Sequence, residues 1–513
     1  MEDDQMRLKK IIFGFLCIIF LANICFAQEP QGYVEIKDGK KIVRVYGTHY
    51  ERGYAHGYLL CNEIIEIFSD YFLAYIFCNN AYSYTAVRTT FEQRFEIDTI
   101  FITESQGILA GIVAAGNTLY NTVLGRNIDE TDILLCNSIV EFTDKRMQFS
   151  RDDLCSSIAS WGTSTENFPE LLSESIITRF LDWTPHQTLM NNHIILVSTP
   201  SESNEQPWIS FTFPALIGCL SSINEEGIGS FYNVGNIDTY NPADTFNPIF
   251  LSIRKGIEVL DYNSSGECNP ADVVSAVCDD VQKTGSIMNV ISSTEKDSFS
   301  LVIECNNSNG VAVRSKEDNT VIAGDNLVAT NHFRKLYTPA YCYRYDKIAD
   351  SLDVSTSINP ARSWILLSGA AGTYMNLQAI QYIPWSGKIL WSTKVDNSPA
   401  YMESWTSFTT NELFDYVSVD APAQDFNPFR TLNIFPIPAR EVVQVTFSAP
   451  QPFMGIVSMY DVKGRVVYWK KITADSGENT VSIVVNEEMN SGVYFIKLNA
   501  YSTSEIRKII VVR

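Results

Sequence analysis

Histidine, basic residues and long apolar runs are scarce in this 513-residue sequence, and each scarcity argues against a class of function. The five histidines lack metal-ligand spacing and no CxxC pair occurs, so no zinc site is expected. Lysine and arginine number 38 against 59 aspartate and glutamate, and this net charge of −21 argues against nucleic-acid binding. Plain solubility accounts for the acidity. Because 45% of the residues are hydrophobic, the chain is predicted to be globular, with two or three domains.

The N-terminus has the features of a targeting segment. An apolar run over residues 11–26 follows Arg7, Lys9 and Lys10 and ends at Ala27. The run is shorter than the ~20 residues that a membrane span needs, although an uncleaved anchor is an alternative. We therefore predict that residues 1–27 are a signal peptide cleaved after Ala27.

Export places the chain in an oxidising compartment, where cysteines can pair. Two of the eleven cysteines, Cys17 and Cys25, would leave with the signal peptide, and nine would remain. If Cys155 is a free thiol, eight cysteines could form disulfides, but their number alone does not show that they do.

Residues 28–154 are predicted to be mostly helical after a first hairpin. Apolar and polar residues alternate over 33–50 around Asp38-Gly39, which is typical of a hairpin. Apolar residues at helical spacing follow from Leu59 to Phe72, and further helices are expected over 104–124 and 130–142.

Two glycines mark one face of the first predicted helix. Gly53 and Gly57 lie four residues apart, so they fall on the same side of a helix. Without side chains there, another backbone can approach closely.

Residues 155–416 differ from the mostly helical segment before them. Their patterns indicate strands first, then helices, then strands again. Strands are expected at 194–197, 208–213, 298–304, 310–315, 320–323, 375–383 and 388–395, and helices at 246–261 and 270–283. This order predicts a layered α+β domain in which helices cover a sandwich of sheets.

The C-terminal part is predicted to be a separate domain. Residues 417–430 contain Pro422 and Pro428 and form a linker, and 431–513 is a run of short strands typical of a small β-sandwich. Residues 427–513 also carry ten Lys or Arg against seven Asp or Glu, the opposite balance to the rest of the chain.

A thiol, a guanidinium and a carboxylate occur close together in the middle of the sequence. Cys155 precedes two serines and a short apolar run, which predicts a loop leading directly into a strand. Arg179 and Asp182 follow shortly after, around an apolar pair. Such groups can activate a cysteine nucleophile, although a lone cysteine is more often a buried apolar residue or half a disulfide. We interpret Cys155 as the first residue of a mature chain, formed when the protein cuts itself between Leu154 and Cys155.

Four stretches near the C-terminus occur in a characteristic order. They are LNIFPIPA at 432–439, MYDVKGRVV at 459–467, SGVYFIKL at 491–498 and KIIVVR at 508–513. Together they resemble the C-terminal sorting domain of type IX secretion substrates, with Ile437 in place of the usual Asn. The resemblance implies passage through the periplasm and outer membrane by the type IX secretion machinery, followed by release or anchoring at the cell surface.

Four further motifs lie within residues 33–415. They are GTHYERGYAHG at 47–57, CSS at 155–157 with Arg179 and Asp182 downstream, INEEGIG at 223–229 leading to Asn233, and ATNHF at 329–333 with Arg362 following. In this order they resemble the penicillin-acyltransferase/carcinine-hydrolase branch of the N-terminal nucleophile hydrolases. Choloylglycine hydrolases and phospholipase-B-like proteins are more distant relatives. The chain departs from this pattern at Phe180, where Asn is usual after the arginine, and at Leu154, where some members have Gly.

The resemblance implies a four-layer αββα fold and a role for each matched residue. The α-amine of Cys155, freed by the cut, has an ordinary pKa near ~8 and would be the general base. Asp182 would hold that amine, and Arg179 would stabilise the thiolate and orient the substrate. Asn331, helped by Asn233, would donate hydrogen bonds to the oxyanion.

Trp183 and Arg362 complete the set as substrate-binding residues. Each matched residue also has a plainer interpretation. Arg179 and Asp182 could form a structural salt bridge, the two asparagines could be turn residues, and Arg362 could serve packing.

We therefore expect an exported, self-processing cysteine amidohydrolase or acyltransferase that needs no cofactor and whose two fragments stay associated. Its substrate would be an amide of a small or lipid-like acid, cleaved through a thioester on Cys155. A phospholipase-B-like ester hydrolase on the same fold is one alternative, and a surface-displayed binding protein without catalysis is another, because fold does not fix function.

Overall fold

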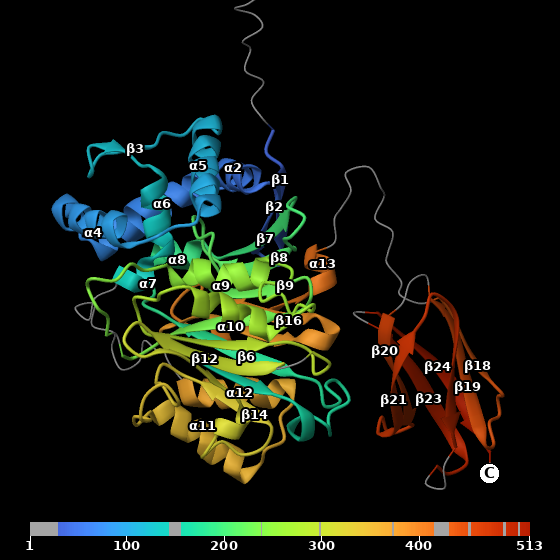
Figure 1. Cartoon of the computed structure of the whole chain (residues 1–513). Coiled ribbons are helices and arrows are strands. Elements are labelled where there is room, and N and C mark those ends of the chain that lie inside the picture. The colour runs from blue at the N-terminus through green and yellow to red at the C-terminus, as the bar shows by residue number, and fades with distance from the viewer. Residues whose placement is uncertain are drawn as a thin grey trace, which may run out of the picture.

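Two β-sheets stacked face to face form the middle of the main body in the computed structural model (Figure 1). The structure describes residues 29–142, 155–237, 239–296, 299–371, 374–414, 430–449, 453–485, 489–500 and 503–512. The predicted signal peptide, Leu154 and nearly all of the predicted linker lie outside the described residues.

The larger sheet has nine strands and is antiparallel except where β2 runs parallel to β7. In spatial order they are β1 (Gly32–Lys37), β2 (Lys40–Gly47), β7 (Ile194–Pro200), β8 (Trp208–Thr212), β9 (Ser221–Asn224), β10 (Gly229–Val234), β11 (Ser286–Ile291), β12 (Ser300–Asn306) and β13 (Gly310–Arg314).

The smaller sheet has six antiparallel strands and contains the segment that follows Cys155. In spatial order they are β14 (Asn326–Ala329), β5 (Ser156–Ser160), β6 (Ile176–Asp182), β15 (Asn376–Ile383), β16 (Lys388–Thr393) and β17 (Thr406–Thr409).

Buried side chains fill the space between the sheets and the space between each sheet and its helices. Phe231 of the larger sheet and Trp391 of the smaller one belong to the core between the sheets. Helices α11 (Tyr343–Val354) and α12 (Pro360–Ala371) cover the outer face of the smaller sheet. Helices α9 (Ile249–Glu258) and α10 (Pro270–Asp279) and the N-terminal helices cover the larger sheet. The main body is therefore mixed α+β, as predicted.

The N-terminal segment is mostly helical, yet its first two strands belong to the larger sheet. The predicted hairpin is β1–β2, which turns at Asp38 and Gly39, both with positive φ. The elements that follow are α2 (His49–Leu59), α3 (Cys61–Glu66), the π-helix η1 (Ile67–Ile76), α4 (Ala81–Arg94), α5 (Thr99–Ala114), β3 (Tyr120–Asn121), β4 (Arg126–Asn127), α6 (Glu130–Asn137) and α7 (Ile139–Phe142). The helix predicted over 104–124 thus ends at Ala114.

Helices α2 and α5 touch backbone to backbone. A capping box between Thr48 and Glu51 starts α2. A Cβ added at Gly53 would lie 2.0 Å from the carbonyl oxygen of Glu104, and one at Gly57 would lie 2.0 Å from that of Ile108. The close approach predicted from the two glycines is therefore confirmed.

Residues 320–323, predicted as a strand, lie in an irregular connection instead. They follow the short helix η3 (Lys316–Asp318) and precede Gly324, whose φ is 74°. The chain crosses here from the larger sheet to the smaller one, and pairing resumes only at Asn326. An apolar pair within a crossover has no neighbouring strand to pair with.

The remaining elements of the main body are short. They are η2 (Gly162–Ser164), α8 (Gln187–Asn191), η4 (Pro384–Ser386), η5 (Ala400–Met402) and α13 (Thr410–Phe414).

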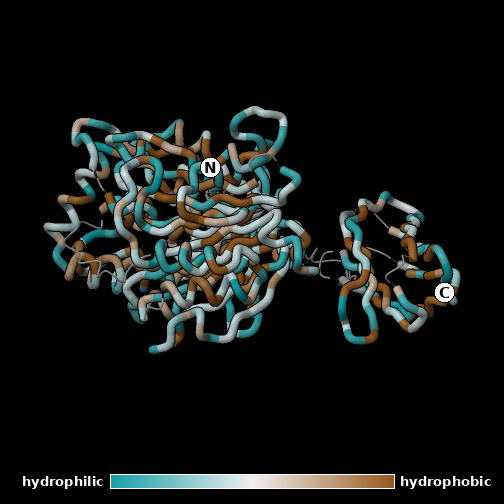
Figure 2. Tube along the Cα trace, turned by 90° about the horizontal axis from the view of Figure 1, so that it is seen from below, coloured by the Kyte–Doolittle hydropathy of each residue, from teal (hydrophilic) through white to brown (hydrophobic). Residues whose placement is uncertain are grey.

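The C-terminal part is all-β, as predicted, and has a core of its own. One sheet pairs β18 (Arg430–Phe435), β19 (Val442–Ala449) and β22 (Gly477–Val484), and the other pairs β21 (Val466–Ala474), β20 (Phe453–Asp461), β23 (Gly492–Ala500) and β24 (Thr503–Val511). Figure 2 shows hydrophobic segments concentrated inside the main body and a second, smaller set in this part.

No helix among the described residues combines the length and the apolar character that crossing a bilayer requires.

We expect Gly57→Ala to lower the free energy of unfolding by about 1–3 kcal/mol, because the added methyl group would overlap the Ile108 carbonyl. Urea unfolding of the full chain measures the change. Gly369→Ala is the matched control, since a Cβ on this α12 glycine meets nothing within 4 Å and should be neutral or slightly stabilising. Equal losses in both variants would contradict the close helix contact.

Candidate functional site

Cys155 lies directly before β5, between strands β6 and β14. Ser157 of β5 pairs with Arg179 on one side and with Ala329 on the other. Continuing this register places Cys155 next to the end of β6 and level with Asn331. The side chain is buried, with 2% of its surface exposed.

Arg179 points its guanidinium at the thiol. Its Nη2 lies 3.8 Å from the Cys155 sulfur and donates to the Tyr232 carbonyl at 2.7 Å. Within the described residues, Nε and Nη1 of this buried side chain have no hydrogen-bond partner. Burial raises the pKa of the Cys155 thiol, and the charge of Arg179 opposes that rise. The thiol itself donates to the Asp182 carbonyl at 3.9 Å.

Asp182 is fully buried at the end of β6 and is held by a residue that sequence reasoning missed. Asn376 of the neighbouring strand β15 pairs with Asp182 and donates from Nδ2 to Asp182 Oδ1 at 2.8 Å. The Asn376 oxygen accepts in turn from the backbone N–H of Tyr401 at 3.0 Å. Asparagine is uncommon inside strands, so its place in an apolar strand pattern was a usable signal.

Arg344, also missed from the sequence, joins Cys155 to Asn331. Its Nη1 donates to the Cys155 carbonyl at 2.6 Å and its Nη2 to Asn331 Oδ1 at 2.8 Å. Arg344 lies in the first turn of α11, where the helix dipole disfavours a cation. That unfavourable position was the available hint of another role.

The two predicted oxyanion donors differ in their hydrogen bonding. Asn331 Nδ2 donates to the Val234 carbonyl at 2.7 Å, which leaves one of its two amide hydrogens free for another acceptor. Asn233 is fully buried in β10, and neither its amide nitrogen nor its oxygen has a partner among the described residues. A buried amide without partners is costly, so Asn233 retains its hydrogen-bonding capacity for a ligand.

Of the two residues predicted to bind substrate, the structure brings only Trp183 to Cys155. Trp183 lines the same cavity as the thiol and donates to the Tyr71 hydroxyl at 2.6 Å. Arg362 lies in α12 and donates to the carbonyls of Ser351, Ser355 and Ser357. These contacts anchor the loop before α12, so we do not include Arg362 in the candidate site.

The cavity beside Cys155 is lined almost entirely by apolar side chains. The N-terminal segment contributes Ile67, Tyr71, Phe72, Cys136, Ile139 and Val140. The chain after the predicted cut contributes Cys155, Leu181, Trp183, Leu189, Phe213, Leu216, Leu220, Tyr232, Val234, Phe250 and Leu377. The wall is thus built from both sides of the predicted cleavage site.

One cluster among the described residues has metal-like spacing, with ligand atoms of His49, Glu202 and Glu205 within 4.8 Å of one another. Arg52 already contacts both carboxylates, at 2.9 Å from Glu205 and 3.5 Å from Glu202. Both ring nitrogens of His49 are also engaged by carboxylates. Protein cations therefore supply the charge that a metal would bring, and we assign no metal here. The nine cysteines of the described residues are free thiols.

Comparison with known proteins identifies the C-terminal region. Residues 433–512 match the family described as the secretion system C-terminal sorting domain. This domain indicates export across the outer membrane to the cell surface or beyond and implies contact with the type IX secretion machinery. No curated protein matches the sequence.

Two solved structures similar to the chain are hydrolases. One is described as a Caenorhabditis elegans N-acylethanolamine-hydrolyzing acid amidase ortholog, at 15% identity, covering 45% of this chain and 93% of that one, with a TM-score of 0.33. The other is a mutant of the conjugated bile acid hydrolase from Clostridium perfringens, at 10% identity, covering 50% and 92%, with a TM-score of 0.32.

We expect Asn376→Leu to lower the free energy of unfolding by about 1–3 kcal/mol, because it removes a hydrogen bond from a buried carboxylate. Asn117→Leu is the control: Asn117 donates to Asn62 at 2.9 Å on the surface, where the loss should stay below about 0.5 kcal/mol. Urea unfolding of both variants gives the comparison. A loss at Asn376 no larger than at Asn117 would show that Asn376 does not hold Asp182.

Proposed function

We propose that this exported protein is a cysteine N-terminal nucleophile hydrolase that cuts its own chain before Cys155 and then hydrolyses amides with a long apolar acyl group. The observation that carries the proposal is the position of the Cys155 thiol. It lies beside Arg179, its backbone is held by Arg344, and it opens onto an apolar cavity. The order of motifs from residue 47 to residue 333 supports the same family.

Cutting the chain would supply the base that the buried thiol needs. The new α-amine of Cys155 has an ordinary pKa near ~8 and lies next to its own thiol. It takes the thiol proton as the sulfur attacks the substrate carbonyl carbon. Asp182, fixed by Asn376, holds the resulting ammonium, and Arg179 stabilises the thiolate.

The tetrahedral intermediate then collapses to a thioester. Asn233 and the second amide hydrogen of Asn331 donate to the oxyanion, and Arg344 orients Asn331 through its oxygen. The ammonium gives its proton to the leaving amine as the C–N bond breaks. Water, activated by the same amine, cleaves the thioester, releasing the acid and restoring the thiol.

The cavity defines the substrate class that we propose. Its lining offers few polar atoms, so an acyl chain would be bound by burial of its methylene groups. We therefore favour a lipid-like acid over a small polar one.

We predict that the purified protein contains a fragment beginning Cys-Ser-Ser-Ile-Ala and that Cys155→Ala stays as one chain. N-terminal sequencing identifies the start of the fragment, and intact-mass spectrometry shows whether each variant is one chain or two. Cys136→Ala is the control, because Cys136 lines the same cavity on the other side of the cut and its variant should still be processed. If Cys155→Ala is cut at the same bond, Cys155 is not the nucleophile of self-processing.

A series of fatty amides from two to eighteen carbons tests the pocket. We expect kcat/KM to rise about fourfold per added methylene until the cavity is full, since each buried methylene contributes about 0.8 kcal/mol. Leu216→Trp should lower kcat/KM for the longest good substrates at least about tenfold and leave short amides nearly unchanged. Matching esters in the same series reveal whether the ester hydrolase alternative holds. No dependence on chain length would rule out the cavity as the acyl site.

A further inference from the structure

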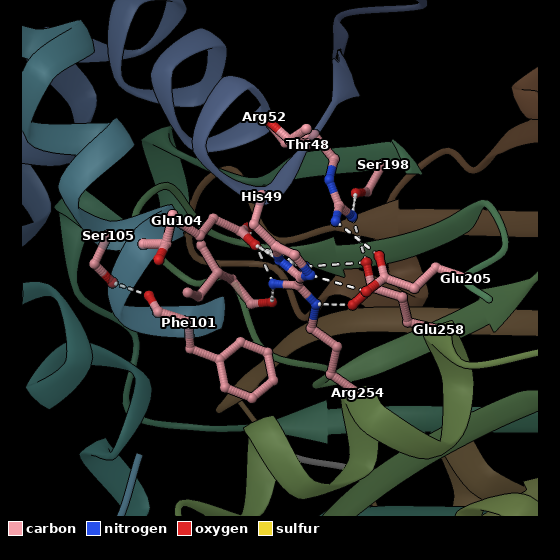
Figure 3. A network of polar contacts seen from close by, with 12 residues as sticks. Thr48, His49, Arg52, Phe101, Glu104, Ser105, Ser198, Glu205, Arg254 and Glu258 are labelled. Atoms are coloured by element: carbon pink, nitrogen blue, oxygen red, sulfur yellow. Dashed lines mark hydrogen bonds and ion pairs between the residues drawn. The ribbon is translucent and has the colours of Figure 1, made fainter. Parts of the chain in front are cut away.

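Six buried charged side chains join the N-terminal segment to the chain that follows Cys155 (Figure 3). His49, Arg52 and Glu104 come from helices α2 and α5, before the predicted cut. Glu205, Arg254 and Glu258 come from after it. We name these six residues the His49 clasp.

Most of the contacts in the clasp cross the cleavage boundary. His49 Nε2 lies 2.9 Å from Glu205, and Arg52 Nη2 lies 2.9 Å from the same carboxylate. Arg254 donates to both oxygens of Glu104, at 3.0 and 2.7 Å. Arg52 also donates to Glu258.

Two further contacts stay on one side of the boundary and orient the partners. His49 Nδ1 lies 2.9 Å from Glu104, and Arg254 Nε donates to Glu258 at 2.8 Å. Every member of the clasp is thereby engaged with at least two others.

The clasp is electrically neutral only when His49 carries a proton. The N-terminal side then holds two cations and one carboxylate, and the other side holds one cation and two carboxylates. Glu202, which is partly exposed, adds a fourth carboxylate 3.5 Å from Arg52. Burial alone would lower the pKa of His49, but its hydrogen bonds to Glu104 and Glu205 outweigh both burial and the nearby Arg254 and raise it to about 9.

We propose that the His49 clasp is a proton-dependent lock between the two fragments of the cut protein, holding the N-terminal segment against the catalytic part while His49 is protonated. The proposal rests on the proposed function in one respect, because self-cleavage is what creates the two fragments. Apolar packing and the parallel pairing of β2 with β7 also hold the segment in place. The clasp adds the pH-dependent contribution to the association of the two fragments.

The direction of the pH effect follows from the raised pKa. A histidine released from the clasp titrates near ~6.5. The stabilisation from protonated His49 is thus complete below that pH and is lost as pH rises through about 9. Losing the proton leaves an uncompensated carboxylate in a buried site, which is costly. Because the N-terminal segment forms part of the cavity wall, release of the segment would also open the acyl site.

The test uses the full chain carrying Cys155→Ala, with a site-specific protease sequence in place of residues 143–150. The protease makes the cut, so the result does not depend on self-cleavage. Fragment retention is then measured by dilution and size exclusion at pH 7 and pH 10. We expect the association constant of the fragments to fall on the order of fiftyfold between these pH values.

His49→Gln should reduce this fall to less than about threefold. His56→Gln is the matched control: His56 is buried in the same helix, and burial lowers its pKa to about 4, so it stays neutral from pH 7 to 10. In the His56→Gln variant the association constant should therefore fall as much between pH 7 and pH 10 as in the parent chain. If His49→Gln does not fold, Glu205→Gln removes one acceptor of His49 and should flatten the response in the same direction.

Two outcomes would overturn the proposal. One is a fall in the association constant between pH 7 and pH 10 that is as large in His49→Gln as in the parent chain. The other is full separation of the fragments at pH 7, where the lock should be closed. A failure of the proposed function is a different result, namely an uncut chain when Cys155 is intact.

Discussion

The site depends on the pairing of one short strand, β5, with a neighbour on each side. Its five residues are all buried, and Cys155 directly precedes the strand. The register with β6 brings Arg179 and Asp182 to the thiol, and the register with β14 brings Asn331. A slip of one residue would turn every side chain of β5 to the other face. The position of the thiol therefore follows from sheet pairing and burial, with Arg344 fixing the backbone of Cys155 from α11.

The N-terminal segment meets the rest of the chain through two kinds of contact with different physical properties. Apolar side chains of η1, α6 and α7 close one wall of the cavity, and this packing is insensitive to pH. The His49 clasp joins the segment to the rest of the chain at another place, through His49, Arg52 and Glu104, and responds to protons. The glycine contact between α2 and α5 keeps the two helices at the distance that lets His49 Nδ1 reach Glu104 at 2.9 Å.

Local sequence patterns correctly predicted structure that depends on neighbouring residues. They failed for structure that depends on contacts between residues far apart in the sequence. Alternation gave the β1–β2 hairpin, and the spacing of Gly53 and Gly57 gave the helix contact. The strand predicted over 320–323 is wrong, because the sequence does not show that a crossover lies here with no strand beside it to pair with.

The site was predicted in part, for similar reasons. The motifs led to Cys155, Arg179, Asp182 and Asn331, which the sheet brings together, and their catalytic roles remain predictions. Arg344 and Asn376 were missed because each acts through a partner far away in sequence. Arg362 followed the motif order, but it lies in α12 and its side chain donates to backbone carbonyls that precede this helix.

In the proposed enzyme, the residues that bind the substrate and those that react with it lie partly on different sides of residue 154. The thiol, the carboxylate and both arginines of the site are encoded after residue 154, while six of the residues that shape the hydrophobic space are encoded before it. In that proposal, substitutions before residue 154 can alter which acyl groups fit the cavity while every proposed reacting group stays the same. The range of substrates of the proposed enzyme could thus be changed by exchanging only that leading part, provided the two parts still pack together.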